Sequence, residues 1–350
     1  MIRILVVDPV DNSRRRVLAA VARHDAVSVV GVASTLADAV ESCLTVRPEV
    51  VALTIHESGD EDVAIVRALM RERPTPIVLV CAGSRVRARE VAFEALKAGA
   101  LDVVEMPDTT SLPSADPFSE RLATALQLMA DVRVVRQIVD RTGEFAPPEA
   151  GHSPAAVEAV GICSSTGGPA ALDFILRRLP VDFPSPIFIV QHISDGFLGG
   201  LVEWLKGTSK LEVRIATDGE VPMAGVVYFA PEQYHLRVGS MGALTFGSEP
   251  PIRSHRPAGE ALFESMAVRY GRRALGVMLT GMGDDGTDGL ARIASMGGIV
   301  LAQDERTSVV YGMPRAVVER GVATEVLALE HMAERITFWA VEGPEGKRHA

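Results

Sequence analysis

Short apolar runs that alternate with segments of helical period constrain the fold of this chain more than any other feature. In the first part of the chain the apolar runs are residues 2–7, 28–33, 50–55, 77–81 and 102–105. Segments with helical spacing lie between them, at residues 13–23, 35–45, 60–72 and 85–98. Apolar runs of this length suit strands that are buried on both faces of a parallel sheet. Residues 1–107 are therefore predicted to form a doubly wound α/β domain, flavodoxin-like in strand order.

A second α/β pattern occupies residues 156–340. Its apolar runs are residues 158–163, 187–191, 213–215, 226–230, 235–238, 243–246, 274–279 and 299–302. Its helical segments are residues 170–178, 197–206, 259–270, 288–295 and 314–319. The connections within 226–246 are short, which favours an antiparallel hairpin. The prediction is a doubly wound, mostly parallel sheet with this hairpin inserted.

The intervening residues 108–155 have a different character and are predicted to be a linker that contains a helix. Residues 108–116 are rich in Ser, Thr and Pro, which indicates a loop, and residues 142–154 contain the Gly, Pro and Ala of a flexible linker. Residues 118–141 have helical spacing over only about three heptads, so a helix packed on one domain is favoured over an independent coiled coil.

Charge and hydropathy exclude several functional classes. The formal charge of −10 over 350 residues argues against non-specific binding to nucleic acid. No uncharged stretch reaches the roughly 18 residues that a bilayer span needs, and the first apolar run is too short for a signal peptide. Cys43, Cys81 and Cys163 lack metal-ligand spacing, and Cys81 and Cys163, at the ends of apolar runs, are interpreted as buried reduced thiols. A cytoplasmic protein without membrane insertion is expected.

The segment A-V-G-I-C-S-S-T-G-G-P at 159–169 is the first that could carry chemistry. It is an apolar strand followed by a small polar turn, which places Ser164, Ser165 and Thr166 at the start of a helix. Backbone N–H groups there favour an anion, so a serine could attack a carbonyl whose oxyanion they stabilise. A simple capping turn or a phosphate loop is the alternative, although neither G-x-G-x-x-G, nor Gly-Lys-Ser/Thr, nor G-x-S-x-G is present.

Two further apolar strands end in residues of catalytic type. His192 follows the run 187–191, and Asp284 and Asp285 lie in the glycine-rich turn after 274–279. A structural histidine, a metal-binding loop or a helix cap would each explain one segment alone. Together they place Ser, His and Asp at the carboxyl ends of three strands, where the ligands of parallel sheets bind.

Six short motifs occur in one order across the second half of the chain. They are G-I-C-S-S-T-G-G-P (161–169), V-Q-H-I (190–193), V-Y-F-A-P-E-Q-Y-H-L (227–236), S-H-R-P (254–257), L-T-G-M-G-D-D-G (279–286) and A-Q-D-E-R-T-S-V-V-Y-G-M-P (302–314). In this combination the chain resembles the chemotaxis protein-glutamate methylesterases, the CheB family.

The resemblance implies a role for particular residues of this chain. The nucleophile falls on Ser165, the base on His192 and the orienting carboxylate on Asp285, with an oxyanion site at the Met282 backbone near Thr166 and Gly283. The implied reaction is hydrolysis of glutamyl γ-methyl esters through an acyl-enzyme, and family members often deamidate glutamines by the same route. No cofactor and no metal are implied.

Two residues depart from the family pattern. Asp284 stands where Asn is usual, and Glu260 stands where Asp is usual. An extra carboxylate beside Asp285 is expected to raise the local pKa.

The first domain resembles the response-regulator receivers that are fused to this esterase, but only as a scaffold. Asp8 is followed by Pro9, Thr54 stands at the phosphoacceptor position, Cys81 or Ala82 at the Ser/Thr position and Met106 at the lysine position. Only Asp8 remains of the residues that would hold Mg²⁺ and a phosphoryl group. We therefore expect no aspartyl phosphorylation, and a domain that acts as a fixed brake or as a docking module.

Three functions remain open from the sequence. The first is the methylesterase, with methylated chemoreceptors or receptor-like proteins as partners and a histidine-kinase complex as a further partner. The second is a non-catalytic receptor-binding scaffold of the same family. The third is an esterase of the same chemistry that acts on another substrate.

Overall fold

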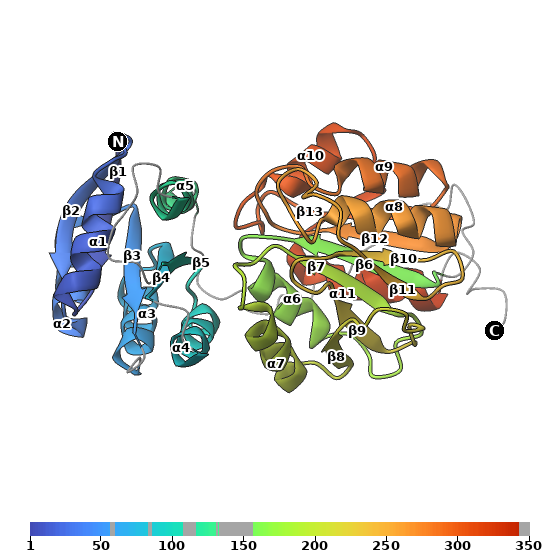
Figure 1. Cartoon of the computed structure of the whole chain (residues 1–350), viewed down its shortest axis with the longest axis horizontal. Coiled ribbons are helices and arrows are strands. Elements are labelled where there is room, and N and C mark those ends of the chain that lie inside the picture. Colours follow the sequence, from blue (N-terminus) through green and yellow to red (C-terminus); the bar gives the residue numbers. More distant parts are fainter. Residues whose placement is uncertain (57–59, 83–85, 108–116, 131, 133–156, 343–350) are drawn as a thin grey trace. The chain divides into compact units, whose positions relative to one another are not determined.

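The computed structural model describes residues 1–56, 60–82, 86–107, 117–130, 132 and 157–342. The chain divides into two compact units, Met1–Val139 and Asp140–Ala350, and each is described by itself (Figure 1). Within the described residues, no helix combines the length and the apolar character that a bilayer span requires.

The first unit contains a five-stranded sheet in the order β2-β1-β3-β4-β5, with every pair parallel. The strands are β1 (Ile2–Val7), β2 (Val27–Ala33), β3 (Val50–Ile55), β4 (Ile77–Ala82) and β5 (Asp102–Met106). The helices are α1 (Asp11–Val21), α2 (Leu36–Val46), α3 (Asp60–Glu72), α4 (Val86–Lys97) and α5 (Pro117–Ala130). This is the predicted flavodoxin-like order, and all six residues of β3 are buried, as expected for a central strand.

Helix α5 belongs to the first unit, where it contacts α1, β3 and β5. The sequence analysis placed it in a linker that begins at residue 108. The reason for the difference is an apolar face on which Leu122, Leu126 and Met129 are fully buried, so the helix completes the core of this unit. The helix was expected over 118–141, and the segment 133–156 lies outside the described residues.

The second unit contains a seven-stranded sheet in the order β14-β13-β12-β6-β7-β9-β8, again with every pair parallel. The strands are β6 (Ala159–Ser164), β7 (Ile187–Gln191), β8 (Glu212–Ile215), β9 (Val226–Phe229), β12 (Ala274–Met278), β13 (Ile299–Gln303) and β14 (Glu325–Leu327). The helices and helical turns are α6 (Gly168–Leu176), α7 (Leu198–Thr208), α8 (Gly259–Tyr270), η1 (Gly271–Arg273), α9 (Thr287–Ser295), α10 (Met313–Glu319), α11 (Leu329–Thr337) and η2 (Phe338–Glu342).

The predicted antiparallel hairpin is present, but it lies outside the main sheet. Strands β10 (His235–Val238) and β11 (Leu244–Gly247) form a separate two-stranded sheet. The hairpin packs against α8, where Leu236, Val238 and Leu244 join the apolar core. It is therefore a cover over the α8 side of the unit and not an insertion into the parallel sheet.

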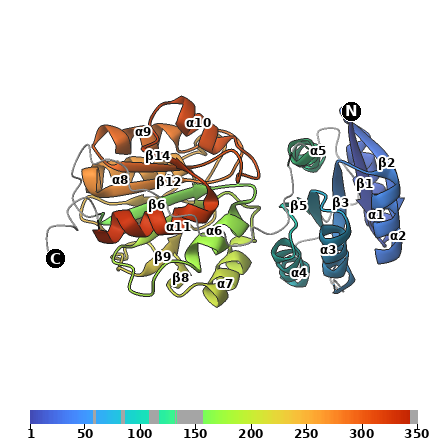
Figure 2. The ribbon, with the colours of Figure 1, turned by 180° about the vertical axis from the view of Figure 1, so that it is seen from behind.

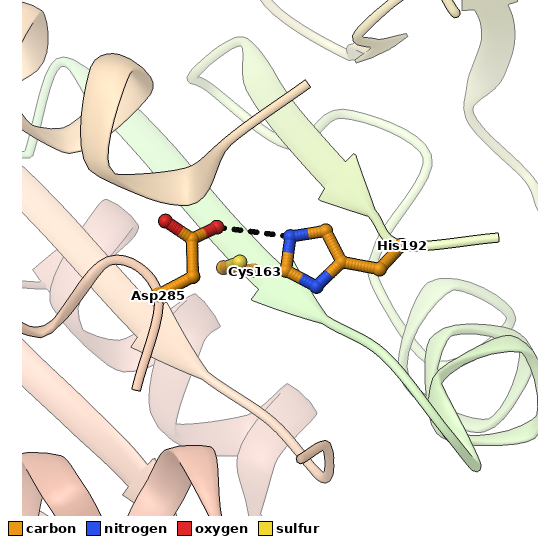
Figure 3. A group of neighbouring side chains, drawn as sticks. All are labelled: Cys163, His192 and Asp285. Carbon is orange, nitrogen blue, oxygen red and sulfur yellow. Dashed lines mark hydrogen bonds and ion pairs between the residues drawn. The ribbon is translucent and has the colours of Figure 1, made fainter. Parts of the chain in front are cut away.

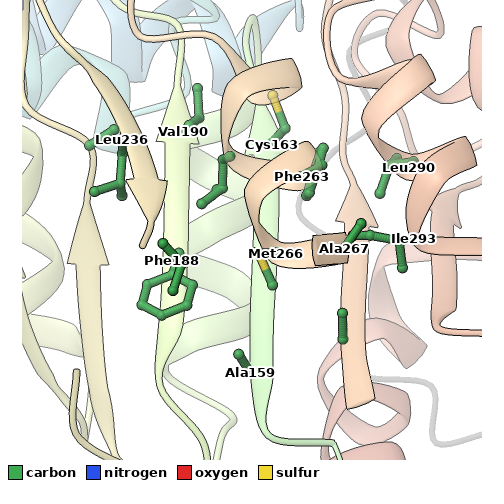
Figure 4. Packing of buried hydrophobic residues seen from close by; sticks show 14 of the residues in the cluster. Ala159, Cys163, Phe188, Val190, Leu236, Phe263, Met266, Ala267, Leu290 and Ile293 are labelled. Carbon is green, nitrogen blue, oxygen red and sulfur yellow. The ribbon is translucent and has the colours of Figure 1, made fainter. Parts of the chain in front are cut away.

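Helices cover both faces of the large sheet, as in other doubly wound folds. Helices α6 and α11 contact each other and lie side by side in the view of Figure 2. On the other face, Phe263 and Met266 of α8 pack against Phe188 and Cys163 of the central strands (Figure 4). The packing is close, because a Cβ on Gly161 of β6 would lie 2.5 Å from the Met266 sulfur. This core holds the central strands in place and so fixes the positions of the strand ends at which the predicted site residues lie.

Candidate active site

The register of the central strands brings the three predicted catalytic segments together. Strand β6 lies between β12 and β7, with Cys163 beside Met278 and Ser164 beside Gln191. Past the strand ends, His192 N donates to the Ser164 carbonyl at 2.9 Å. Ser165 N donates to the Thr280 carbonyl at 3.0 Å. Ser165 and His192 therefore stand at adjacent strand ends, as the sequence predicted.

Gln191 holds the backbone on both sides of the site. Its Oε1 accepts a hydrogen bond from the Ser164 hydroxyl at 2.6 Å. Its Nε2 donates to the carbonyls of Ser165 and His192, each at 2.8 Å. Position 168 must be glycine, because a Cβ there would lie 2.1 Å from Gln191 Oε1. Gln191 thus ties the nucleophile candidate and the base candidate into one rigid arrangement.

His192 and Asp285 form a buried hydrogen-bonded pair (Figure 3). His192 Nε2 lies 2.9 Å from Asp285 Oδ2, and the two side chains are 8% and 1% exposed. Asp285 also accepts the N–H groups of Gly259, at 2.6 Å, and Glu260, at 3.2 Å. Burial works to raise the pKa of Asp285, but the His192 contact and these N–H donors outweigh it and the pKa is lowered.

The protonation of Asp285 decides which nitrogen of His192 can act as a base. An ionised carboxylate only accepts hydrogen bonds, so Nε2 of a neutral His192 carries the proton and Nδ1 keeps its lone pair. Nδ1 is buried and has no hydrogen-bond partner within the described part of the chain. In this structure the Ser165 hydroxyl does not complete that contact, a common state of such sites without substrate.

The turn after β12 packs in close contact with Ser165. A Cβ on Gly281 would lie 2.7 Å from the Cβ of Ser165, so only glycine fits there. Gly283 has φ +87°, a conformation that favours glycine. The Met282 side chain between them is 43% exposed and faces solvent at the site. The turn is thereby shaped for close approach to the serine.

Two free backbone donors flank this turn. Within the described residues, the N–H groups of Thr166 and Met282 donate to no acceptor. Their positions are fixed by Thr280, whose hydroxyl donates to the Thr166 carbonyl at 2.9 Å, and by Gly312 N, which donates to the Gly281 carbonyl at 3.0 Å. Unpaired N–H groups held beside a serine are the kind of donor that stabilises an oxyanion.

Comparison with known proteins decides the family of this chain. Residues 160–336 match the family model described as CheB methylesterase. A protein-glutamate methylesterase/protein-glutamine glutaminase of Myxococcus xanthus is 41% identical over 96% of both chains, and one of Rhizobium meliloti is 36% identical over 99% of both. The chain belongs to the CheB methylesterase family.

A crystal structure from the same family supports this placement. The Thermotoga maritima CheB methylesterase catalytic domain is 40% identical, with a TM-score of 0.50, and it covers 52% of this chain and 98% of its own. The relatives from Myxococcus and Rhizobium align with the first unit as well, because they match almost the whole chain.

Asp284, one of the departures from the CheB pattern, is occupied by a partner. The Arg253 guanidinium pairs with Asp284 and also with Asp288, the latter at 2.6 Å. The Asp284 side chain is 55% exposed, and the pKa of neighbouring Asp285 is lowered. The expected rise is not found at Asp285, because the His192 contact and the N–H donors of Gly259 and Glu260 outweigh burial there.

Glu260, the second departure from the CheB pattern, is a buried acid behind Asp285. Its side chain is 7% exposed, and Oε2 has no hydrogen-bond partner within the described residues. Burial raises the pKa of Glu260 to about 7, and the neighbouring Glu264, Asp288 and Asp285 add to the shift. Glu260, whose pKa is near neutral, therefore directly follows Gly259, whose N–H donates a hydrogen bond to Asp285.

His255 is a site residue that the sequence analysis quoted within S-H-R-P without assigning it a role. Its ring stacks on the His192 ring with centroids 3.8 Å apart and planes 3° from parallel. Burial and the neighbouring His192 lower the pKa of His255 to about 4. A pocket of about 160 Å³ opens beside this pair, with Glu232 and Arg256 in its wall.

One cluster at the site has the composition of a metal centre. Cys163, His192 and Asp285 each place a ligand atom within 4.8 Å of the others. However, burial raises the pKa of the Cys163 thiol well above its ordinary value, and a thiol must lose its proton to bind a metal. Asp285 Oδ2 already accepts two short hydrogen bonds. These contacts favour the hydrogen-bonded pair over metal ligation.

The receiver positions of the first unit lie at the carboxyl ends of its strands. Asp8 and Pro9 follow β1, while Thr54, Cys81 and Met106 lie near the ends of β3, β4 and β5. Asp8, Thr54, Cys81 and Met106 are each at most 1% exposed. Burial is the main cause that raises the pKa of Cys81 to about 12. The edge where a receiver would hold its phosphoryl group is thus filled by buried side chains.

His56 pairs with the remaining acid of this edge. Its Nε2 lies 3.0 Å from Asp8 Oδ1, and its backbone N–H donates to Asp62 Oδ2 at 2.9 Å. Burial disfavours the charged forms of both Asp8 and His56. The hydrogen bond between them acts in the opposite direction, and the pKa of Asp8 is lowered while the pKa of His56 is raised. His56 directly follows β3, but its residue type alone gave no sign of this pairing in the sequence.

Proposed function

We propose that this chain hydrolyses glutamate γ-methyl esters on chemoreceptor-type proteins, with Ser165, His192 and Asp285 as its catalytic triad. The observation that carries the proposal is the buried His192–Asp285 hydrogen bond beside Ser165 in a chain of the CheB methylesterase family. Methylated chemoreceptors are the proposed partners, a histidine-kinase complex is a further one, and the proposed location is the cytoplasm.

In the first step, His192 acts as the general base. Its Nδ1 takes the proton of the Ser165 hydroxyl while Oγ bonds to the ester carbonyl carbon. Asp285 stabilises the imidazolium that forms, because its ionised carboxylate accepts a hydrogen bond from His192 Nε2–H. The N–H groups of Thr166 and Met282 are proposed to hold the oxyanion.

In the second step, the tetrahedral intermediate collapses. The bond between the carbonyl carbon and the methoxy oxygen breaks, and His192 returns its proton so that methanol leaves. Water then attacks the acyl-Ser165 ester with His192 as base. Cleavage of the acyl bond restores the Ser165 hydroxyl and releases the glutamyl carboxylate.

Deamidation of glutamine side chains is proposed as a second reaction of the same triad. An amide passes through the same kind of tetrahedral oxyanion, and ammonia replaces methanol as the leaving group. The relatives from Myxococcus and Rhizobium carry both activities in their names.

The first unit is proposed to regulate the esterase or to dock a partner without aspartyl phosphorylation. Thr54 offers a hydroxyl where an acyl phosphate needs a carboxylate. Asp8, the remaining acid after β1, is already hydrogen-bonded to His56. Both observations support a receiver-like scaffold that no longer accepts a phosphoryl group.

The test is methanol release from a methylated chemoreceptor fragment. The wild-type chain is expected to release methanol, and Ser165→Ala is expected to abolish release. Ser295→Ala is a matched control, because among the described residues that hydroxyl bonds only to the Arg292 carbonyl within α9. Receptor binding without turnover by the wild type would favour the non-catalytic scaffold. Turnover of small esters alone would favour a different substrate.

A second arm asks whether the first unit is a brake. Residues 155–350 are compared with the full chain, because the related Thermotoga catalytic domain was crystallised alone. A faster isolated unit is expected for a brake, and equal rates would leave the docking role.

A further inference from the structure

The stacked pair of His192 and His255 is the feature of the site that the triad does not explain. Their ring centroids lie 3.8 Å apart with planes 3° from parallel, so one face of the His192 ring is covered by the other imidazole. His192 belongs to the β7 end, whereas His255 comes from the segment before α8. Two elements distant in sequence therefore meet at the catalytic base.

His255 is delivered by a tight turn over residues 252–255. Ile252 and His255 exchange two backbone hydrogen bonds, at 3.0 and 2.9 Å. The two central residues, Arg253 and Ser254, have φ values of +49° and +70°, a conformation that costs free energy for residues other than glycine. Such a turn persists only when its surroundings hold it in place.

Arg253 supplies that hold. Its guanidinium pairs with Asp284, the neighbour of the triad aspartate, and with Asp288 of α9. The turn that carries His255 is thereby fastened to the turn that carries Asp285. The base, its orienting acid and the stacked histidine form one connected unit.

A hydrogen bond alone leaves the His192 ring free to rotate about it. The Asp285 contact fixes Nε2, while Nδ1 has no partner within the described residues. A parallel ring against its face fixes the plane and, with it, the direction of the Nδ1 lone pair. The charged and titratable groups that act on His255 are His192, Asp285 and Asp284. At neutral pH an uncharged His255 can cover the imidazolium that forms during turnover without opposing its charge.

We propose that His255 is a positioning residue for the catalytic base: its ring fixes the plane of His192 so that Nδ1 stays directed at the proton it must take. The proposal rests on the proposed function for the role of His192. It does not require that His255 touch the substrate or change its own protonation.

The experiment compares His255→Ala, His255→Gln and His255→Phe in the full chain. The first two remove the ring, and the third keeps a flat ring without nitrogen. We expect kcat for methanol release to fall at least tenfold in the two variants without a ring, with KM within twofold of wild type. His255→Phe is expected to recover most of the lost kcat. His331→Ala in α11 is the matched control and should keep wild-type kcat.

A second readout needs no turnover. In protein with ¹⁵N-labelled histidine, the His192 Nε2–H proton should give a protected resonance that Asp285→Asn removes. We expect its exchange with water to rise at least tenfold in His255→Ala and His255→Gln and to stay slow in His255→Phe.

Three outcomes would overturn the proposal. They are a wild-type kcat in the variants without a ring, unchanged exchange of the Nε2 proton, and a Phe variant no better than the Ala variant. An inactive wild type would overturn the proposed function alone, since the proton-exchange readout still tests the positioning. His255→Gln keeps the comparison possible if His255→Ala folds poorly.

Discussion

At the residue scale, much of the proposed chemistry depends on side chains that do not react. Gln191 fixes the backbone of Ser165 and His192, and Thr280 fixes the backbone at Thr166, one of the proposed oxyanion donors. The His255 ring stacks on the ring of His192, the proposed base. A site of this kind loses activity when a supporting contact shifts the reacting atoms by a fraction of an ångström.

Gln191→Glu should inactivate the enzyme without changing the size of the side chain. The carboxylate cannot donate to the carbonyls of Ser165 and His192, so both lose a hydrogen bond. We expect kcat/KM for methanol release to fall by about 100-fold and the free energy of unfolding to fall by about 1–3 kcal/mol. Urea unfolding measures the second effect. Wild-type kcat/KM in this variant would show that the two carbonyl contacts do not position the triad.

Glu260→Gln should change how stability depends on pH. The folded-state pKa of about 7 lies above the ordinary 4.5, so the folded protein binds this proton more tightly than the unfolded chain does. Stability from this group is therefore full below pH 4.5 and is lost as pH rises through 7. The Gln variant should be more stable than wild type at pH 8 by on the order of 1–3 kcal/mol and should show little difference at pH 4.5.

The measurement is urea unfolding of wild type and Glu260→Gln at several pH values between 4.5 and 8. Comparing the two proteins cancels the titration of other groups, including Asp285, whose lowered pKa acts in the opposite direction. Parallel stability curves across this range would contradict the assignment.

At the element scale, the sequence predicted the parts of the site that lie on strand ends. Apolar runs mark β6, β7 and β12, and a parallel sheet must gather their carboxyl ends, so Ser165, His192 and Asp285 could be placed at one edge. The turn that carries His255 could not be found in the same way. Its positive φ values fall on Arg253 and Ser254, and neither residue type signals such a conformation.

Other errors at this scale have the same physical origin. The position of the β10–β11 hairpin outside the main sheet depends on packing against α8, which local periodicity does not contain. Strand β14 is only three residues long, Glu325–Leu327, and its apolar residues continue into the start of α11, so the sequence does not separate a strand from the helix that follows. The assignment of α5 to the first unit depends on which core buries its apolar face.

Gly281→Ala should disrupt the turn that packs against Ser165, the proposed nucleophile. The added Cβ would lie 2.7 Å from the Ser165 Cβ and 2.3 Å from the Met313 sulfur, so the turn or Ser165 must move. We expect at least a 100-fold loss of kcat/KM and a destabilisation of about 1–3 kcal/mol. Gly199→Ala in α7 is the matched control, because a Cβ there meets nothing within 4 Å. That control should keep full activity and equal or greater stability.

At the scale of the whole molecule, the chain combines two parallel α/β sheets that differ in whether they carry the side chains for the chemistry expected of their fold. The second unit retains the proposed triad with its supporting contacts. The edge of the first unit holds a hydrogen-bonded pair of His56 and Asp8, together with the buried Thr54, Cys81 and Met106. The first unit thus has the sheet and core of a receiver but lacks the side chains with which a receiver accepts a phosphoryl group.

Small phosphoryl donors should therefore leave the protein unchanged. Incubation with Mg²⁺ and acetyl phosphate is expected to give no mass increase of a phosphoryl group and no change in the rate of methanol release. Intact-protein mass spectrometry and the methanol assay measure the two effects. A base-labile phosphoryl adduct on the first unit would disprove the prediction. Thr54→Asp would test whether restoring a carboxylate is enough to accept the group.

Cys43, Cys81 and Cys163 are all buried thiols, and Cys163 lies close to Asp285 of the proposed triad. A maleimide can reach a buried sulfur only in molecules whose surrounding structure has opened. The labelling rate therefore reports on these opening events and not on the closed structure. Mass mapping would then time the opening of each unit separately. The labelling rate of Cys163, the residue before Ser164, would then report how often the strand edge that carries the proposed site opens.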